Sequence, residues 1–411
     1  MPADLIVIGA GPAGLMAAGT AARNGHQVVV LEKNDRPGRK LRITGKGRCN
    51  VTNDCEPQDV IAAATANGRF LYSCVQAFSP ADTMAFFEAQ GVQLKTERGN
   101  RVFPISDHAQ DIVDALAGFC KDAGVRFCFG CDADQILTED GVVTGVHLKG
   151  GKVLQAPNVL IACGGSSYAA TGSDGSGIRL ARKLGHTITP ILPSLVPLIS
   201  VDSDCAQMQG LSLRNVGVRV EDTVSGKDVY KDFGELLFTH FGLSGPTILS
   251  ASAHMRTMSP GRYRVHIDLK PALTPEQLDA RLLRDLEKNH NRQFSNSLGE
   301  LLPAKSIPVV VDRSGISPEI RCHSLTREQR RTLVALLKDF TVDIEGFRPI
   351  NEAIVTSGGV DVREVNPKTM ASKLVRGLYF AGEVLDLDAY TGGFNLQIAF
   401  STGYAVGSHL E

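Results

Sequence analysis

The sequence predicts an α/β fold in which a nucleotide-binding parallel sheet is interrupted by an inserted, mostly β region. Three observations support this prediction. A strand, a glycine-rich turn and a helix open the chain at residues 5–23, a second apolar strand runs into Gly164-Gly165, and a third runs into Gly382 near the end. The residues between the last two read as short β runs and helices, so we expect distant parts of the chain to complete one sheet.

The first 33 residues have the order of a βαβ unit. Leu5–Ile8 is a continuous apolar run, typical of a parallel strand buried on both faces. A turn with Gly9, Gly11 and Gly14 follows, then an Ala-rich helix and a second strand that ends in Glu32. This glycine spacing permits a tight turn, close approach of a pyrophosphate and close helix packing, and the helix N-terminus favours phosphate charge. Glu32 is placed to accept from ribose hydroxyls, so the unit predicts a bound dinucleotide.

The later segments favour FAD over NAD. A Rossmann-like domain for NAD would continue to alternate strands and helices after the first unit, whereas residues 125–159 read as short β runs with glycine turns. The strand at 378–381 is closed by Gly382-Glu383, and Gly392-Gly393 opens a last helix. Glu383 can hold a sugar-alcohol chain, and the helix N-terminus can stabilise negative charge on a reduced ring. A long cofactor across the carboxyl edge of the sheet, such as FAD, fits both sites.

A polar loop, "RKLRITGKGRCNVTN" at residues 39–53, follows the first unit. Its Arg and Lys side chains suit phosphate or flavin contacts, its glycines let backbone N–H groups approach a planar ring, and Asn50 has both a donor and an acceptor. Cys49 has three interpretations: half of a redox disulfide, a metal ligand, or a packing residue beside the flavin. The six-residue spacing to Cys55 and the lack of neighbouring ligands favour the third.

The middle of the chain predicts an insertion. Prolines at 190, 193 and 197 indicate a linker, β-like runs follow, and helices are expected at 274–289 and 326–338. The expected domains are therefore an FAD-binding part at 1–190, a β-barrel-like domain at 191–273, a helical insertion at 274–340, and a return strand with the second FAD-binding part at 341–411.

Long motifs carry a family resemblance over essentially the whole chain. "PGRKLRITGKGRCNVTN", "LLFTHFGLSGP" and "SGGVDVREVNPKTMASKLVRGLYFAGEVLDLDAYTGGFNLQIAFSTG" resemble the BaiN-type, aminoacetone-oxidase-like bacterial flavoproteins, a family of NAD(P)/FAD-dependent oxidoreductases. The strand-end sites resemble those of the glutathione-reductase-like superfamily, with Cys163 in place of Thr and Glu383 in place of Asp. The resemblance implies a Rossmann-like FAD-binding domain interrupted by a β-barrel-like domain with a small helical insertion.

The predicted cofactor contacts come from the glycine turn, the polar loop, the strand ends and the last helix. They are Gly9, Ala10, Gly11, Pro12, Ala13, Gly14, Glu32, Lys33, Arg39, Lys40, Thr44, Gly45, Gly47, Arg48, Cys49, Asn50, Ala133, Cys163, Gly164, Gly382, Glu383, Gly392, Gly393, Phe394 and Asn395. Weak catalytic candidates are Cys49, His240 and Tyr390, each with a packing or hinge role as its alternative. We expect no metal site.

Composition limits the partners and the compartment. The chain has 411 residues and a formal net charge of -1. A near-neutral chain has no field for a polyanion, so we expect a small-molecule substrate and no nucleic-acid partner. No apolar run approaches the ~18 residues that cross a bilayer, and no signal peptide opens the chain, so we expect a cytoplasmic protein without a membrane partner. The nine cysteines are odd in number and scattered, which predicts reduced thiols.

The expected reaction is FAD-dependent. The leading prediction is NAD(P)H-linked reduction of a small organic substrate by hydride transfer through flavin N5, with NAD(P)H as a transient co-substrate because the chain has no second glycine-rich nucleotide unit. One alternative is oxidation of a small amine such as aminoacetone by O2. Another is an FAD-carrying RNA-modification or scaffold protein, which the near-neutral charge disfavours.

Overall fold

The computed structural model describes residues 3–410 and contains two compact units. Among the described residues, unit 1 comprises 3–194 and 350–410, and unit 2 comprises 195–349. The second boundary lies later than the predicted residue 341. The reason is that the strands β17 (Phe340–Ile344) and β18 (Gly346–Phe347) pair within the sheet of unit 2.

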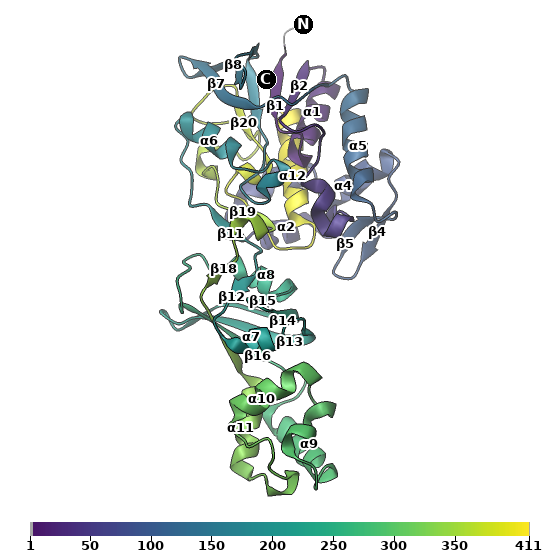
Figure 1. Cartoon of the computed structure of the whole chain (residues 1–411). Helices are drawn as coiled ribbons and strands as arrows, with labels where there is room; N and C mark the ends of the chain where they lie inside the picture. The colour runs from purple at the N-terminus through teal and green to yellow at the C-terminus, as the bar shows by residue number, and fades with distance from the viewer. Residues whose placement is uncertain (1–2, 411) are drawn as a thin grey trace. The chain divides into compact units, whose positions relative to one another are not determined.

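Unit 1 is built on a five-stranded sheet with the order β20-β10-β1-β2-β6, in which every pairing is parallel (Figure 1). The strands are β1 (Leu5–Ile8), β2 (Val28–Glu32), β6 (Arg126–Phe129), β10 (Asn158–Ile161) and β20 (Leu378–Phe380). Every residue of β1, β10 and β20 is buried, as the continuous apolar runs predict. Because all five strands run the same way, the segments that follow them meet at one edge of the sheet.

Two helices pack side by side at that sheet, α1 (Pro12–Arg23) and α12 (Phe394–Ser408) (Figure 1). Glycines set their close approach. A Cβ on Gly403 would lie 2.3 Å from the Ala13 carbonyl oxygen, and a Cβ on Gly407 would lie 2.7 Å from the Ala17 oxygen. Gly403 contacts Ala13, and four residues later Gly407 contacts Ala17. Because the residue numbers increase in the same direction along both helices, α1 and α12 are parallel.

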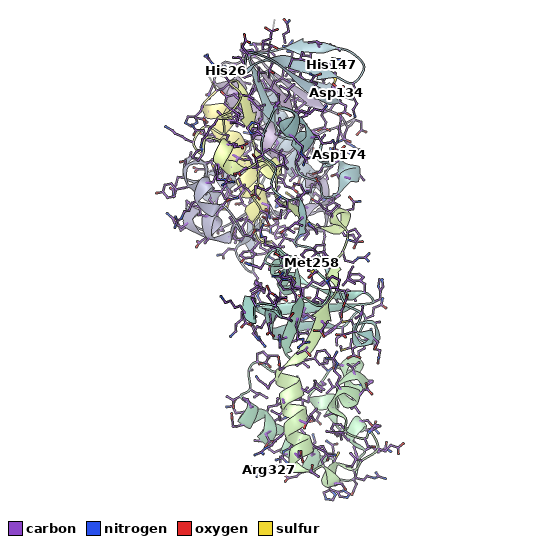
Figure 2. The ribbon with its side chains drawn as sticks, turned by 90° about the vertical axis from the view of Figure 1, so that its left-hand side faces the viewer. His26, Asp134, His147, Asp174, Met258 and Arg327 are labelled. Atoms are coloured by element: carbon purple, nitrogen blue, oxygen red, sulfur yellow. A yellow bond between two sulfur atoms is a disulfide. The ribbon has the colours of Figure 1, made fainter. Side chains whose placement is uncertain are left out.

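Smaller elements surround this core. The strands β7 (Ala133–Glu139), β8 (Val142–Leu148) and β9 (Val153–Gln155) form an antiparallel sheet between β6 and β10, which confirms the β runs predicted there. Across β7 and β8, His147 Nδ1 lies 2.6 Å from Asp134 Oδ1, and this hydrogen bond lowers the pKa of Asp134 (Figure 2). The remaining elements of unit 1 are β3 (Thr52–Asn53), α2 (Pro57–Ala63), α3 (Tyr72–Ala77), α4 (Pro80–Ala89), β4 (Leu94–Glu97), β5 (Arg101–Pro104), α5 (Ala109–Asp122), α6 (Ser176–Lys183), β11 (Leu192–Ser194) and β19 (Val355–Ser357).

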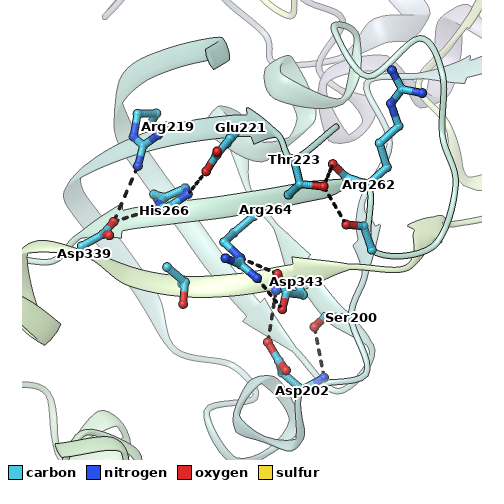
Figure 3. A network of polar contacts seen from close by, with 12 residues as sticks. Ser200, Asp202, Arg219, Glu221, Thr223, Arg262, Arg264, His266, Asp339 and Asp343 are labelled. Carbon is cyan, nitrogen blue, oxygen red and sulfur yellow. Dashed lines mark hydrogen bonds and ion pairs between the residues drawn. The ribbon is translucent and has the colours of Figure 1, made fainter. Parts of the chain in front are cut away.

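Unit 2 contains a seven-stranded sheet with the order β17-β16-β13-β14-β15-β12-β18. Its other strands are β12 (Leu198–Ile199), β13 (Ser212–Asp222), β14 (Lys227–Thr239), β15 (Gly242–Ser244) and β16 (Tyr263–Asp268). Polar side chains link neighbouring strands (Figure 3). His266 on β16 lies 3.0 Å from Glu221 on β13 and 2.7 Å from Asp339, and Arg264 lies 2.6 Å from Asp343 on β17.

Unit 2 has five α-helices among the described residues. They are α7 (Ser203–Gln207), α8 (Pro246–Ser252), α9 (Pro275–Lys288), α10 (Ile307–Ser314) and α11 (Arg327–Lys338). Two of them, α9 and α11, begin within one residue of the predicted starts at 274 and 326. Thr274 and Thr326 cap α9 and α11, because each hydroxyl accepts from the backbone N–H of a glutamine three residues on, at 3.2 Å. Leucines and valines of α9, α10 and α11 form a hydrophobic cluster of their own.

One expectation about the cysteines is wrong. Cys128 and Cys131 are joined by a disulfide, and the remaining cysteines are free. The signal is present in the sequence as Cys-Phe-Gly-Cys. The Cys131 N–H donates to the Glu32 carbonyl oxygen at 3.0 Å, so the disulfide lies beside the carboxyl end of β2.

Two glycine substitutions test the helix packing. We expect Gly403→Ala to lower the free energy of unfolding by about 2 kcal/mol, because the new Cβ meets a backbone oxygen that cannot rotate away. Gly118→Ala is the matched control on α5, where a Cβ meets no atom within 4 Å. It should stabilise by about 0.5–1 kcal/mol through helix propensity. Urea unfolding measures both, and equal effects of the two variants would contradict the packing described.

Candidate cofactor site

The site is assembled at the carboxyl edge of the parallel sheet. The segments that follow β1, β2, β10 and β20 carry, in that order, Gly9–Gly14, Lys33, Cys163–Gly164 and Gly382–Glu383. Ala133, which follows β6 along the chain, begins β7, is buried, and pairs with Leu148. The topology therefore brings the separately predicted segments to one place, beside β1, where the chain continues to β2 on one side of the strand and later returns as β10 on the other.

The glycine turn after β1 is closely packed at two positions and open at a third. A Cβ on Gly9 would lie 2.7 Å from the Ala162 oxygen, and one on Gly14 would lie 2.0 Å from the Gly9 oxygen. A Cβ on Gly11 would meet only the Ala162 oxygen, at 3.9 Å. Gly11 precedes α1, and no side chain caps that helix. The turn therefore leaves uncapped N–H groups beside open space, as a phosphate requires.

Glu32 is held in a fixed orientation at the end of β2. Its Oε2 accepts from the Ala10 N–H at 2.9 Å, and its Oε1 accepts from the backbone and side-chain nitrogens of Asn34 at 2.9 and 2.7 Å. Arg39 donates in turn to Asn34 Oδ1 at 2.8 Å. A carboxylate has about four acceptor positions, and three are used here, so one remains for a sugar hydroxyl.

Glu383 is the second carboxylate of the edge, and Lys40 neutralises it. Lys40 Nζ lies 2.8 Å from Glu383 Oε2 and also donates to the Ser167 hydroxyl at 2.7 Å. The Thr356 N–H donates to Glu383 Oε1 at 2.8 Å. Burial raises the pKa of Glu383, but the charge and hydrogen bond of Lys40 and the hydrogen bonds of Thr356 together outweigh it, so the pKa is lowered. Ser167 and Thr356 were not predicted, although the Ser pair after Gly164-Gly165 is a signal for one of them.

Arg48 makes contacts within the protein. It forms ion pairs with Glu97 on β4 and with Asp107, and its guanidinium lies 4.1 Å from the centre of the Phe103 ring. A cofactor phosphate would have to compete with two carboxylates for this side chain. The geometry therefore favours a role in holding the loop, and a direct cofactor contact of Arg48 stays a prediction.

Cys49 is a fully buried, free thiol. Burial raises the pKa of Cys49 to about 12, against a smaller effect of its hydrogen bond with Thr44. The backbone N–H of Cys49 also donates to the Thr44 oxygen at 3.0 Å. A thiol that stays protonated and shielded from solvent is a poor nucleophile, which favours the packing interpretation.

Asn50 connects the polar loop to the start of α12. In the amide orientation that satisfies its neighbours, its oxygen accepts from the Gly393 N–H at 3.0 Å and its nitrogen donates to the Thr52 oxygen at 3.0 Å. A Cβ on Gly393 would lie 2.3 Å from the Thr52 carbonyl, so only glycine permits this approach. No side chain caps α12, which leaves the N–H groups of its first turn available. The Asn395 amide instead bonds to the backbone of Ala389: its oxygen accepts from the Ala389 N–H at 2.9 Å, and its nitrogen donates to the Ala389 oxygen at 2.7 Å.

The other predicted residues lie in different surroundings. Lys33 forms an ion pair with Asp174 at 2.9 Å; although burial raises the pKa of Asp174, Lys33 and Ser176 lower it to about 2 (Figure 2). Burial raises the pKa of Cys163 to about 11. Tyr390 is half-buried beside Gly392-Gly393, and its N–H donates to the Ala63 oxygen. His240 lies in unit 2, in the turn between β14 and β15, with its ring against Phe241.

The spacing of the two helix N-termini suits FAD. Gly403 of α12 packs on Ala13 at the start of α1, and Phe394 precedes Gly403 by nine residues (403 minus 394). At 1.5 Å per residue, the N-terminus of α12 lies about 13 Å beyond that of α1. One uncapped N-terminus can hold the pyrophosphate and the other the electron-rich edge of the flavin, with the carboxylates of Glu32 and Glu383 available to sugar hydroxyls. The residues present therefore fit FAD.

A pair of glycine variants tests the phosphate position. Gly11 has an extended backbone with φ −83°, and its Cβ meets no close atom, so Gly11→Val should fold but lose FAD because the side chain occupies the phosphate approach. Gly14→Val should instead destabilise the fold itself, since its Cβ meets the Gly9 oxygen at 2.0 Å. Flavin absorbance of the purified protein and thermal unfolding measure the two effects. Gly11→Val protein that copurifies with stoichiometric FAD would refute this placement.

Replacement of Lys40 tests the buried ion pair. Lys40→Met should lower the free energy of unfolding by about 2 kcal/mol at pH 7, at the low end for a buried pair because 22% and 20% of the two side chains are exposed. Since the pKa of Glu383 is lowered in the wild type, the pair stabilises above the unfolded carboxyl pKa and this contribution is lost as pH falls. The difference between variant and wild type should therefore shrink from pH 7 toward pH 4.

The control for this variant is the double variant Lys40→Met with Glu383→Gln. It removes the buried charge and should recover most of the lost stability at pH 7. Urea unfolding of the FAD-free protein across pH provides the readout. A stability loss that does not change with pH, or no recovery in the double variant, would show that Lys40 acts through packing alone.

Within residues 3–410, no helix is both long and apolar enough to cross a membrane. In the same range, no group of three or more His, Cys, Asp and Glu side chains is placed to hold a metal ion.

The chain is similar to known proteins along its full length. It is 31% identical over 406 residues to the 3-dehydro-bile acid delta(4,6)-reductase of Clostridium scindens, covering 98% of this chain and 97% of the relative. It is 31% identical over 411 residues to the ribosomal RNA dihydrouridine synthase of Escherichia coli, covering 99% and 98%. A solved 3-ketosteroid-delta4-(5alpha)-dehydrogenase of Rhodococcus jostii shares the fold, with a TM-score of 0.52 at 15% identity and coverage of 99% and 97%.

These findings confirm the predicted fold class and the resemblance to BaiN-type flavoproteins, and they identify an FAD-dependent oxidoreductase. The expectation of no nucleic-acid partner is not supported, because one full-length relative is named for ribosomal RNA. The family model described as "HI0933-like protein Rossmann domain" matches residues 3–409. The chain therefore belongs to the HI0933-like Rossmann-domain family.

Proposed function

We propose that the protein reduces a carbon–carbon double bond conjugated to a carbonyl group, with NAD(P)H as the electron donor. The observation that carries this proposal is the carboxyl edge of the parallel sheet, where two uncapped helix N-termini and the carboxylates of Glu32 and Glu383 suit FAD. When bound, FAD supplies the hydride-transfer chemistry, so the reaction asks little of individual side chains.

The names of the full-length relatives support the reaction class. One is a delta(4,6)-reductase of a 3-dehydro-bile acid, and the other forms dihydrouridine in ribosomal RNA. Both names describe saturation of a ring double bond conjugated to a carbonyl. The balanced reaction consumes NAD(P)H, a proton and the double bond, and yields NAD(P)+ and the saturated ring.

The residues of the site bind and orient. The first turn of α1 favours phosphate charge, and that of α12 favours negative charge at the ring it faces. Lys40 keeps Glu383 ionised, so that this carboxylate can accept hydrogen bonds at the end of β20. The burial of Cys49 and its raised pKa of about 12 argue against a role as nucleophile.

NAD(P)H is best explained as a transient co-substrate. The chain has a single Gly-x-Gly-x-x-Gly unit, at Gly9–Gly14, and in this proposal it binds FAD. A nicotinamide that binds only for hydride transfer needs no second unit of this kind.

Reduction of uridine in ribosomal RNA is the second candidate within the same reaction class. It is favoured by the relative of Escherichia coli, which matches as much of this chain as the bile acid reductase does and at the same identity. The net charge of -1 gives no general affinity for RNA, so this candidate requires local contacts with the folded RNA.

An anaerobic experiment tests the proposal. Purified FAD-loaded protein is mixed with NADH or NADPH, and the visible flavin band is followed. We expect one nucleotide to bleach the band within seconds and a conjugated enone or uridine-containing ribosomal RNA to restore it. Failure of both nucleotides to bleach the band would refute NAD(P)H linkage.

Product analysis with different substrates distinguishes enone reduction, reduction of uridine in ribosomal RNA and amine oxidation. Mass spectrometry of ribosomal RNA, before and after incubation with the reduced protein, detects dihydrouridine, and product analysis of a 3-keto steroid enone detects the saturated ring. Bleaching by aminoacetone alone, followed by reoxidation with O2, would instead establish the amine oxidase and overturn the reductase.

A further inference from the structure

Unit 2 contains a cavity that the proposed function does not use. It has a volume of about 150 Å³ and lies between the sheet and the segment around α10. Its walls are apolar and almost fully buried, formed chiefly by Met208, Val216, Phe238, Leu302, Val310 and Phe340. A volume of this size accommodates a benzene-sized molecule, which corresponds to a single ring or a short branched chain.

A β-bulge in β13 contributes residues to the lining of the cavity. Leu213 of β13 pairs with Leu236, whereas Val216 pairs with Gly234. Two residues of β13, Arg214 and Asn215, therefore lie opposite the single residue Glu235 of β14. Both bulged residues line the cavity and are exposed. Bulges redirect side chains and recur next to binding sites. Here the bulge places a guanidinium and an amide at the rim of an apolar space.

Lys270 contributes a second cation to the same rim. It is half-buried, it lines the cavity, and its ammonium has no ion pair or hydrogen bond among residues 3–410. The nearby carboxylate of Asp268 is engaged by Lys338 at 2.5 Å. Burial, followed by the charge of Arg281, lowers the pKa of Lys270.

The lining is therefore unbalanced in charge. It contains Arg214 and Lys270, and no aspartate or glutamate lines the cavity within the described part of the chain. A half-buried, unpaired ammonium carries a desolvation penalty that an anion beside it would relieve. The apolar interior and the cationic rim together define a ligand with one apolar end and one anionic end.

We propose that this cavity is a binding site for a small organic carboxylate, with its ring or branched chain among the apolar side chains and its carboxylate between Lys270 and Arg214. The site lies wholly within unit 2 and is separate from the cofactor edge of unit 1. Its ligand is a benzoate-sized monoanion, because the volume excludes a nucleotide or a steroid.

Calorimetric titration of the FAD-loaded protein with benzoate tests the proposal. We expect saturable binding, weakened at least about tenfold by Lys270→Met because a charge-assisted contact is lost. Lys231→Met is the matched control, since Lys231 is an exposed lysine of β14 that does not line the cavity. It should leave the affinity unchanged. Benzamide, the neutral analogue, should bind at least about tenfold more weakly than benzoate.

A second variant tests the volume. Leu213→Phe fills the space from a half-buried position and should abolish binding while thermal unfolding shows that the fold is retained. The proposal is overturned if benzoate shows no saturable binding, if Lys270→Met and Leu213→Phe bind it as the wild type does, or if benzamide binds equally well. It is also overturned if benzoate binding perturbs the flavin spectrum and survives both variants, since the ligand would then occupy unit 1.

Discussion

The parallel hydrogen bonding of five strands is the constraint on which the cofactor site depends. The central strand β1 pairs with β2 and with β10, and β20 joins from the far end of the chain with Leu160 opposite Tyr379. Parallel neighbours require long crossover connections, so the segments that leave the five strands converge on one edge although they are hundreds of residues apart. A binding site made of short turns follows from that geometry.

A buried carboxylate at such an edge imposes a second requirement. Glu383 loses hydration at the end of β20, and its ionised form is favourable only with a cation and donors nearby. Lys40 comes from the loop after β2, Ser167 from the segment after β10, and Thr356 from β19. The carboxylate thus ties together four segments of the chain. The order of the polar loop at residues 39–53 is thereby coupled to the completion of the sheet.

The local features of this fold were predictable from the sequence, and the non-local contacts were not. The first βαβ unit and the helices that begin after Thr274 and Thr326 depend on residues within a few positions of each other, and the structure confirms them. The ion pair of Lys40 with Glu383 joins residues 343 positions apart. The ion pairs of Arg48 are also non-local, because its partners come from β4 and from a turn after β5. The second unit boundary depends on a non-local contact as well, because β17 pairs with β16 across the whole helical insertion. The disulfide between Cys128 and Cys131 differs from these non-local contacts, because the Cys-x-x-Cys spacing in the sequence indicates it.

A cofactor that performs the hydride chemistry also explains how one fold serves dissimilar substrates. The relatives named for a bile acid and for ribosomal RNA are each 31% identical to this chain and match it from end to end, so neither activity requires an added domain. Hydride transfer needs a double bond held against the flavin in a site that excludes water, whatever is attached beyond the reacting ring. In the proposed arrangement the glycine turn, Glu32 and the pair of Lys40 with Glu383 hold the cofactor. Selection of the substrate is therefore left to side chains outside this edge, where a change costs neither the sheet nor the flavin.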